Sequence, residues 1–464
     1  MLYDLNWLAT GKQFPPEGEL ERLQRYDQNR QIFENKHGEI YGEQWKRIEK
    51  VVGNTADIIS YPIVLNYQKK VSIKTADFLF VERPIFTSDN PAVDEIVTAS
   101  DLYEIGYEGV IDCSRFGAGV YKIDVENNKG KISISSPSYT FAIVDKEDRK
   151  KIKQYVLAWV NEWKESGVTK GRLYVKVHDK GKYSSYTYDM SGTSIGKLIE
   201  SKENIPTGLD DFAIVPIHNL LTSDSVWGID DYADIDSIIS ELEIRTAQIS
   251  KILDVHASPT VSGSQTALTE GKDGKYTFKA GNYYSRMSQE EPPLEYVTWD
   301  ANLDSNFKQI DKLLNHLASI SEMGVAIFNS DIKLGQVPSG TALRMLYINV
   351  LAKVTRVRNS FDKGFKKAIA LASQIGYTRV EPEDITITWQ DGLPDDPKET
   401  AEIISVRTGG KATMSQRRAL KQYDGMTEDA VEEELAFIAE EDMAMNGTLT
   451  LVDDNEDDTD EVIE

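Results

Sequence analysis

The chain has 464 residues, of which 40% are hydrophobic and 28% are charged, a composition typical of a globular protein with roughly two to four domains. It carries 76 acidic and 52 basic residues, a net charge of −24, whereas proteins that grip nucleic acid usually carry a basic excess. Its single cysteine, Cys113, excludes an internal disulfide and a cysteine-based zinc site.

No apolar run approaches the roughly 18 residues of a membrane span, and the first residues lack the basic and apolar segments of a secretory signal. Synthesis in a reducing cytoplasm therefore fits. The acidic excess leaves two interpretations open. Either the protein never meets nucleic acid, which composition alone favours, or it must meet nucleic acid without adhering to it.

The first predicted elements are helices. Residues 17–50 are highly charged with an apolar stripe, and residues 64–84 place apolar side chains at helical spacing before Pro84. A further short helix is expected within residues 91–105.

From about residue 107 the hydrophobic period changes to two. The segments "GVYKIDV", "KISISS", "YTFAIVD", "QYVLAWV", "GRLYVKVHD" and "YSSYTYDM" alternate in this way. Turn residues in "NNKGK" and "HDKGK" separate neighbouring segments. The pattern predicts an antiparallel meander that ends near residue 190.

The helical period returns in residues 225–254 and again in residues 302–323. Aspartates crowd the amino end of the first helix, where carboxylates favour the helix dipole. The apolar stripes include Ile235, Ile238, Leu242 and Ile249 in the first helix, and Phe307, Ile310 and Leu314 in the second. Between the two helices, residues 255–298 are rich in Gly, Pro, Ser and Tyr and predict a small inserted module.

An irregular segment then precedes the longest helical pattern, which runs from residue 339 to about residue 374. Gly324, Gly335 and Pro338 interrupt the helices on either side, and Ser339 offers an N-cap to the next helix. The strand "DITITWQDG", short acidic helices and an acidic tail follow. The tail is a run of like charges and is expected to be disordered.

A search for catalytic or ligand-binding motifs finds none that is complete. The five histidines are scattered, and "GKDGKYT" and "GGKAT" lack the upstream Gly and the final Ser or Thr of a phosphate loop. "FGAGVYK" has dinucleotide-like glycine spacing but is expected between strands, without a helix that it opens. There is no GxSxG. We therefore expect no enzymatic activity, no metal site and no cofactor.

Several segments taken together resemble the portal proteins of tailed bacteriophages, the family typified by the siphophage portals. They are "RYDQNRQIFENKH", "NYQKKVSIKTADFLFVERP", "SRFGAGVYKI", "DSVWGIDDYADIDSIISELE", "PSGTALRMLYINVLAKVTRVRNSF" and "WQDGLPDDPKETAE". No single motif is diagnostic, but their order and spacing are specific, and the resemblance covers nearly the whole chain.

The resemblance implies an α+β portal fold with an α/β wing, a two-helix stem, a small α/β clip, a long wing-spanning helix and a helical crown. The implied parts are the wing (1–224), a stem helix (225–254), the clip (255–299), a second stem helix (300–323), the tunnel loop (324–338), the long helix with a wing strand (339–391), the crown (392–446) and an acidic disordered tail (447–464).

The same resemblance implies a ring, usually of twelve subunits, at one vertex of the capsid. Double-stranded DNA would pass through its axis, without sequence-specific contact, during packaging and ejection. The implied partners are further copies of the chain, the terminase large subunit, a head-completion or adaptor protein, and the major capsid and scaffolding proteins. The implied location is the virion, after synthesis in the bacterial cytoplasm, with no membrane involved. The family carries no ATPase motif of its own because terminase is the packaging motor.

The resemblance also gives roles to residues in the tunnel loop. Asn329, Ser330, Lys333 and Gln336 would face DNA, and Gly324, Gly335, Pro338 and Gly340 would act as hinges. Repeated round a ring, Lys333 would form a belt of weak, non-specific phosphate contacts. The alternative is that Lys333 only tops a solvated loop.

Other residues keep two interpretations. The stem stripes suit packing between subunits of a ring, but also an ordinary helical hairpin in a monomer. Tyr276, Phe278, Tyr283 and Tyr284 of the clip suit contacts with partner proteins, but also the cores of short strands. The basic residues of 353–367 could touch DNA, although pairing with a neighbour's acidic helices is favoured.

Two other classes of protein remain as alternatives. One is a different ring-forming head–tail structural protein without a DNA gate, which would lack an irregular segment between its stem and wing helices. The other is an enzyme of nucleic-acid processing, which would require a metal-ligand cluster or nucleotide motif.

Overall fold

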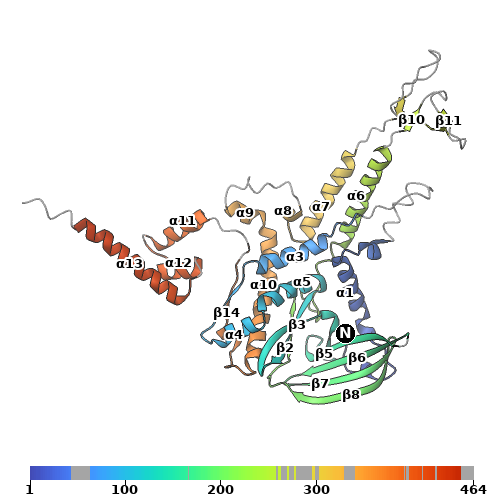
Figure 1. Cartoon of the computed structure of the whole chain (residues 1–464), viewed down its shortest axis with the longest axis horizontal. Coiled ribbons are helices and arrows are strands. Elements are labelled where there is room, and N and C mark those ends of the chain that lie inside the picture. Colours follow the sequence, from blue (N-terminus) through green and yellow to red (C-terminus); the bar gives the residue numbers. More distant parts are fainter. Residues whose placement is uncertain are drawn as a thin grey trace, which may run out of the picture. The chain divides into compact units, whose positions relative to one another are not determined.

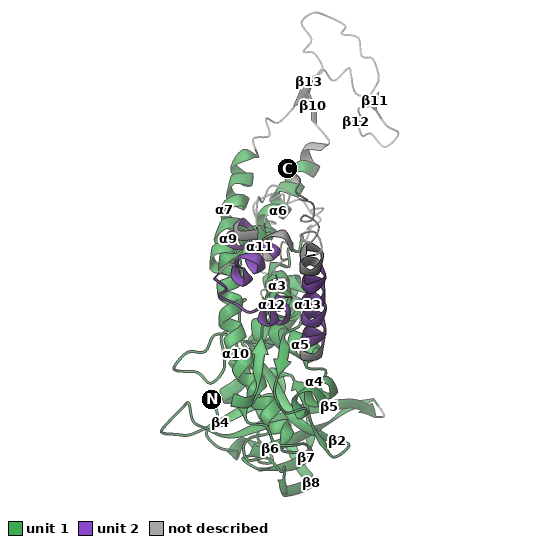
Figure 2. Cartoon of the chain, turned by 90° about the vertical axis from the view of Figure 1, so that its left-hand side faces the viewer, with its two compact units in different colours: residues 1–332, 346–392 green, residues 333–345, 393–464 purple. Residues whose placement is uncertain are grey.

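A computed structural model of the chain (Figure 1) describes residues 1–42, 63–165, 167–257, 260–262, 269–270, 276–277, 295–297, 303–328, 340–390, 392, 397–409, 411–423 and 426–450. The chain divides into two units (Figure 2), which are described separately. One comprises Met1–Ile332 with Leu346–Gly392, and the other comprises Lys333–Met345 with Leu393–Glu464. The first unit combines a helical core with antiparallel sheets, which confirms the α+β class.

The helical core of the first unit is built around the long helix α10. Its helices are α1 (Leu20–Phe33), α3 (Tyr67–Phe80), α4 (Ala92–Ala99), α5 (Leu102–Phe116) and α10 (Ile348–Ser373), with a two-stranded sheet of β1 (Ile85–Thr87) and β14 (Thr386–Thr388) beside them. Phe361 and Phe365 lie four residues apart on one face of α10 and are fully buried. Their rings contact each other and those of Phe80 and Tyr121 in edge-to-face pairs, the geometry that aromatic rings prefer.

A five-stranded antiparallel sheet contains the last four of the six strands predicted for the meander, whereas the first two belong to a separate sheet. Its strands, in order, are β4 (Thr140–Val144), β5 (Ile152–Glu165), β6 (Val168–Asp179), β7 (Lys182–Ser191) and β8 (Ser194–Pro206). Side chains alternate between its faces. One face packs against apolar residues of the N-terminal segment, including Leu8 and Phe14, and the other packs against a second sheet. The meander was expected to end near residue 190, so β8 was missed.

The second sheet has three strands in the order β3-β2-β9, namely β3 (Lys129–Ser135), β2 (Ala118–Glu126) and β9 (Ile214–His218). The prediction that strands begin near residue 107 was wrong, because α5 continues to Phe116. Gly117 then ends the helix at φ 82°, a left-handed conformation that favours glycine. A Cβ there would lie 2.1 Å from the Gly228 carbonyl oxygen. Part of the glycine spacing in "FGAGVYK" therefore serves a helix-to-strand turn.

Strand β8 lies at one edge of the five-stranded sheet. Within the described part of the chain, cover is seen over its beginning: Gly11 N–H donates to the Ile195 carbonyl at 2.7 Å, and Ile195 N–H donates to the Lys12 carbonyl at 2.8 Å. The rest carries exposed charged side chains, and its pairing with β7 is interrupted by register shifts. The charged residues are Lys197, Glu200, Lys202 and Glu203.

Helices α6 (Asp236–Ala257) and α7 (Asp304–Ile320) lie side by side (Figure 1). They correspond to the predicted stem helices, but α6 begins at Asp236 rather than near residue 225. Its 22 residues span about 33 Å and the 17 residues of α7 about 25 Å, so the two are less closely matched than expected. The chain between them forms short strand pairs: β10 (Thr260–Ser262) with β13 (Glu295–Val297), and β11 (Thr269–Glu270) with β12 (Tyr276–Thr277).

The second unit is helical in its described part. It contains α11 (Pro397–Thr408), α12 (Gln416–Tyr423) and α13 (Glu428–Thr450), whose small core includes the buried Met414, Ala419 and Val431. The tail predicted from residue 447 begins later than expected, because α13 continues to Thr450. Residues 451–464 lie outside the described residues.

The long helix predicted from residue 339 is two helices, α9 (Gly340–Leu346) and α10, separated at Tyr347.

Two histidines lie in the sheets of the first unit, His178 buried and His218 half-buried. His178 is on β6 and His218 ends β9. Burial lowers the pKa of each imidazole to about 4, with a further contribution at His178 from the nearby Lys176 ammonium. Both side chains are therefore neutral near pH 7. Among the helices that the structure describes, none has the length and apolar character required to cross a membrane.

We expect acidification to destabilise the fold through these two histidines. Below the ordinary histidine pKa of about 6.5 the unfolded chain binds a proton that the folded chain rejects until about pH 4. The contribution of each histidine to the free energy of unfolding is therefore fully present above about pH 6.5. It falls by about 2 kcal/mol per histidine between pH 6.5 and pH 5. Urea unfolding of His218→Gln across this range should show a shallower decline than the unsubstituted protein. The exposed His316→Gln should retain the original decline, and an equal decline in both variants would contradict the assignment.

Candidate functional site

The segment expected to line a channel lies largely outside the described residues. Asn329, Ser330, Lys333, Gln336, Gly335 and Pro338 all belong to residues 329–339, so their predicted roles stay predictions. The described structure shows how the chain enters and leaves the segment. It enters from α8 (Val325–Phe328), preceded by Gly324 at φ 69°, and leaves into α9, which begins at Gly340. Gly324 thus occupies a left-handed turn between α7 and α8.

Two side chains anchor the entry to this segment. Ile327 and Phe328 are both 9% exposed, whereas Val325 is 45% exposed. The Phe328 ring meets Tyr67 of α3 edge-to-face, with 5.4 Å between centroids. Ile327 and Phe328 therefore pack at the base of this segment, whereas Val325 is largely exposed.

A buried ion pair lies beneath this base. The ammonium of Lys353, on α10, is 3.0 Å from an Asp231 carboxylate oxygen and donates to the Ser321 carbonyl at 3.2 Å. The Lys353 side chain is only 2% exposed. Asp231 also accepts hydrogen bonds from Ser114 at 2.7 Å and Asn219 at 2.8 Å. The network joins α10 to α5, to the end of α7 and to the chain just before α6.

Other cations of the basic run at 353–367 also have partners within the chain. Arg356 pairs with Glu322, and its hydrogen bonds lower the pKa of that carboxyl. Lys366 pairs with Asp362 at 2.9 Å, and Lys367 pairs with Asp211 at 2.7 Å. These cations therefore have acidic partners within the chain, and their pairing with a neighbour's acidic helices stays a prediction.

A second, half-buried network fixes the start of α6. Arg25 of α1 contacts Asp236 at 2.7 Å and Asp230 at 2.9 Å. Asp230 also accepts backbone hydrogen bonds from the chain that leads into the helix. The aspartates that were assigned to the helix dipole therefore bind side chains of other elements as well.

Glu243 is a buried residue further along α6. One of its carboxylate oxygens lies 2.6 Å from a ring nitrogen of the buried His37. The same oxygen of Glu243 accepts a hydrogen bond from the Leu65 backbone at 2.9 Å. Glu243 thus connects α6 to two segments that precede α3 in the chain.

The predicted stem-packing residues fall into three classes of exposure. Ile235, Leu242 and Ile249 are buried, and Ile238, Ile310 and Leu314 are half-buried. Phe307 is 51% exposed in the single chain. Of the predicted clip contacts, the backbone of Tyr276 lies in β12, whereas Phe278, Tyr283 and Tyr284 lie outside the described residues.

Sequence reasoning missed Lys353 and Asp231 as a structural pair. One signal was available, because Lys353 falls on the apolar face of α10 marked by Val350, Val354 and Val357. A charged residue in such a stripe requires a buried partner. In the described part of the chain, no group of three His, Cys, Asp or Glu residues is placed to hold a metal ion.

The helices, sheets and paired stem define a chain of the portal class, and comparison with known families supports this. The chain belongs to the phage portal protein family: a family model described as "Phage portal protein, SPP1 Gp6-like" matches residues 14–447. The resemblance drawn from the sequence is therefore confirmed. Membership makes the chain a structural protein of a phage particle that acts as an oligomeric portal ring. No curated protein matches the chain.

Three solved structures show distant similarity, each at 11% sequence identity. The neck of a native gene transfer agent particle computed with C12 symmetry has a TM-score of 0.41, covering 76% of this chain and 88% of that chain. The neck of an empty particle computed with C6 symmetry gives 0.45, with 89% and 95% covered. The virion of a native particle gives 0.44, with 83% and 99% covered. Likenesses this distant carry no argument about the present chain.

Proposed function

We propose that the chain assembles into a dodecameric ring at one capsid vertex and that double-stranded DNA passes through the ring during packaging and ejection. The family match across residues 14–447 carries this proposal. The ring would also receive the terminase large subunit and the head-completion proteins, and would contact the capsid and scaffolding proteins. The chain itself would have no enzymatic activity, since terminase would supply the packaging energy.

Exposed apolar side chains on the stem support assembly. Leu253 on α6 and Phe307 and Ile320 on α7 are 52%, 51% and 45% exposed in the single chain. Apolar side chains of this size are stabilised when another surface covers them. In a ring, one subunit's α6–α7 pair would lie against a different face of its neighbour, a heterologous contact that closes on itself.

The segment 324–338 would be the tunnel loop. Its entry is held by Ile327 and Phe328, which are buried against the helical core. Lys333 would supply weak phosphate contacts, and the net charge of −24 would keep DNA from adhering elsewhere along the ring.

Light scattering of the purified chain, with negative-stain class averages, tests the proposal. We expect particles of about twelve times the 52.2 kDa chain mass with a central hole. A dimer closed by a two-fold interface would contradict it, because such an interface leaves no axial channel.

Phe307→Asp is expected to disrupt assembly while leaving the subunit folded. The side chain is half exposed, so a charge there costs the isolated subunit little, but it would be buried without a partner at the stem interface. The concentration at which half the chains assemble should rise by about tenfold or more, measured by analytical ultracentrifugation. Phe307→Leu is the matched control and should assemble normally. Unchanged assembly of Phe307→Asp would remove this residue from the interface.

A further inference from the structure

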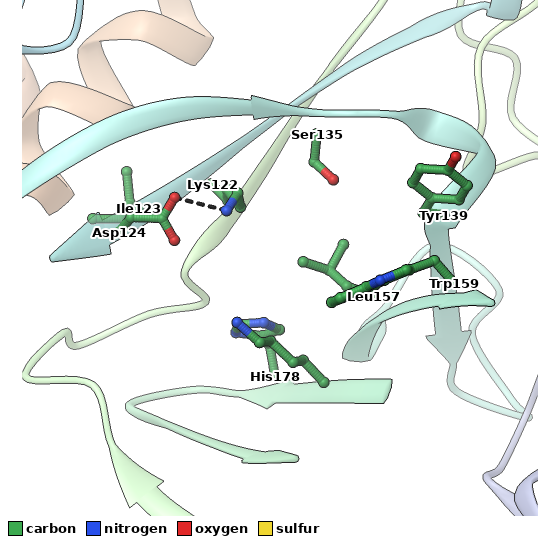
Figure 3. A pocket seen from close by; sticks show the side chains of 9 residues that line it. Lys122, Ile123, Asp124, Ser135, Tyr139, Leu157, Trp159 and His178 are labelled. Atoms are coloured by element: carbon green, nitrogen blue, oxygen red, sulfur yellow. Dashed lines mark ion pairs between the residues drawn. The ribbon is translucent and has the colours of Figure 1, made fainter. Parts of the chain in front are cut away.

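A cavity of about 240 Å³ lies between the two sheets of the first unit (Figure 3). Strands β2 and β3 supply one wall, and strands β5 and β6 supply the other. The channel and stem proposed above make no use of it. Its volume corresponds to about eight water molecules, or to one small organic molecule.

Strand alternation explains which side chains face the cavity. On β6, Val175 and Val177 pack against the N-terminal segment, so Lys176 and His178 point to the opposite face, toward the three-stranded sheet. On β2, Tyr121 belongs to the helical core, whereas Lys122 faces the cavity. The apolar side chains of β2 and β6 pack away from the cavity, so the polar side chains of both strands face it.

The central polar group of the cavity is His178. It is only 8% exposed, and neither of its ring nitrogens has a hydrogen-bond partner among the described residues. A buried polar group without a partner is unfavourable by roughly 1–3 kcal/mol, and such groups are uncommon in native proteins. In Figure 3 the imidazole lies across the open space from the Ser135 hydroxyl.

Cations outnumber anions round this space. Lys122 and Lys176 both line it, and Asp124 is the one carboxylate among the lining residues. Asp124 is already engaged, because it pairs with Lys122 at 2.7 Å and accepts a hydrogen bond from Ser133. The Lys122–Asp124 pair is neutral overall, so the exposed Lys176 supplies the net positive charge of the cavity. The Lys122 ammonium has three donors, and those that Asp124 does not use can still bind a ligand.

The remaining wall is apolar. Leu157 and Trp159, both on β5, lie at one side of the cavity (Figure 3), and the indole ring of Trp159 is stacked on Tyr174 with 5.8 Å between centroids. A ligand that binds both the cationic and the apolar wall has an anionic group at one end and a hydrocarbon segment at the other. Inorganic anions satisfy only the cationic wall.

From this arrangement we propose that the cavity binds an organic carboxylate, with its oxygens toward His178, Lys122 and Lys176 and its carbon chain against Trp159 and Leu157. The carboxylate would accept the N–H of the neutral imidazole and a hydrogen bond from each ammonium, bonds that are stronger because they involve ions. The same chemistry is offered by a free dicarboxylate and by a glutamate side chain of another polypeptide.

Equilibrium dialysis of the full chain against radiolabelled glutarate tests the site. We expect one glutarate per chain with half-saturation near about 1 mM, as is usual for a ligand of this size. Lys176→Gln should weaken binding about tenfold, through loss of one charge-assisted hydrogen bond. Lys176 is exposed, so the substitution leaves the packing intact. Lys197→Gln on β8 makes the same charge change on the same sheet away from the cavity and should bind normally.

Competition identifies the source of the carboxylate. Displacement by N-acetylglutamate amide, but not by N-acetylglutamine amide, would support a side chain presented by another polypeptide. Displacement by neither would support a free dicarboxylate. Equal displacement by inorganic phosphate would overturn the organic ligand, and equal glutarate binding by the Lys176→Gln and Lys197→Gln variants would overturn the site. These outcomes are independent of whether the chain forms a ring.

Discussion

Asp231→Ala is expected to lower the free energy of unfolding by about 3–5 kcal/mol, because it leaves the Lys353 ammonium buried without its counter-charge. The lysine side chain is 2% exposed, so its charge is compensated mainly by protein groups rather than by solvent. The substitution also removes the acceptor for Ser114 and Asn219. Urea unfolding followed by tryptophan fluorescence, at fixed protein concentration, measures the change.

Two further variants test whether the stability lost in Asp231→Ala comes from leaving a buried charge unpaired or from losing any ion pair. Arg356→Ala breaks an ion pair whose side chains are 41% and 46% exposed, and it should cost less than about 1 kcal/mol. The double substitution Asp231→Asn with Lys353→Met removes both charges and should recover part of the stability that Asp231→Ala loses. A loss for Asp231→Ala as small as that for Arg356→Ala would show that the lysine is hydrated.

Phe361→Ala is expected to lower the free energy of unfolding by about 3–5 kcal/mol, since it empties an aromatic site at the centre of the helical core. Phe361 is fully buried, and its ring contacts Phe80, Tyr121 and Phe365 with centroids between 5.5 and 6.4 Å apart. The neighbouring rings are held by their own contacts, so the cavity will not close fully. Thermal and urea unfolding should both report the loss.

Phe437→Ala provides the matched control. Phe437 is 54% exposed on α13, so its truncation should change stability by no more than about 0.5 kcal/mol. If Phe361→Ala were equally mild, the aromatic cluster would not be the main packing centre of the first unit.

Elements with one clear hydrophobic period could be predicted from the sequence. The α10 stripe that includes Val350, Val354, Phe361 and Phe365 is the buried face of that helix. The strands from β2 to β7 also follow their alternation. These patterns are local, so they require no knowledge of distant partners.

Elements whose pattern is broken by tertiary packing were missed or misplaced. Helix α5 carries Gly106 and Gly109, which weaken a helical prediction, yet a Cβ at Gly109 would lie 1.8 Å from the Tyr121 hydroxyl oxygen. Close packing against Tyr121 therefore requires Gly109, the same residue that weakens the prediction of a helix from the sequence. Strand β8 alternates poorly because most of its side chains are exposed.

The buried networks could not be predicted, since their members are far apart in the chain. His37 and Glu243 are separated by 206 positions, and each looks like an ordinary polar residue in its own segment. The cavity at His178 likewise depends on how two sheets face each other.

The edge formed by β8 has a consequence for how copies of this protein meet at high concentration. An open strand edge is a template on which another chain can extend the sheet. Here the N-terminal segment occupies the first part of the edge, and Lys197, Glu200 and Lys202 with the β7–β8 register shifts make the rest a poor template. Sheet extension between particles is thereby discouraged, which helps newly made subunits avoid fibrous aggregates before they reach a capsid.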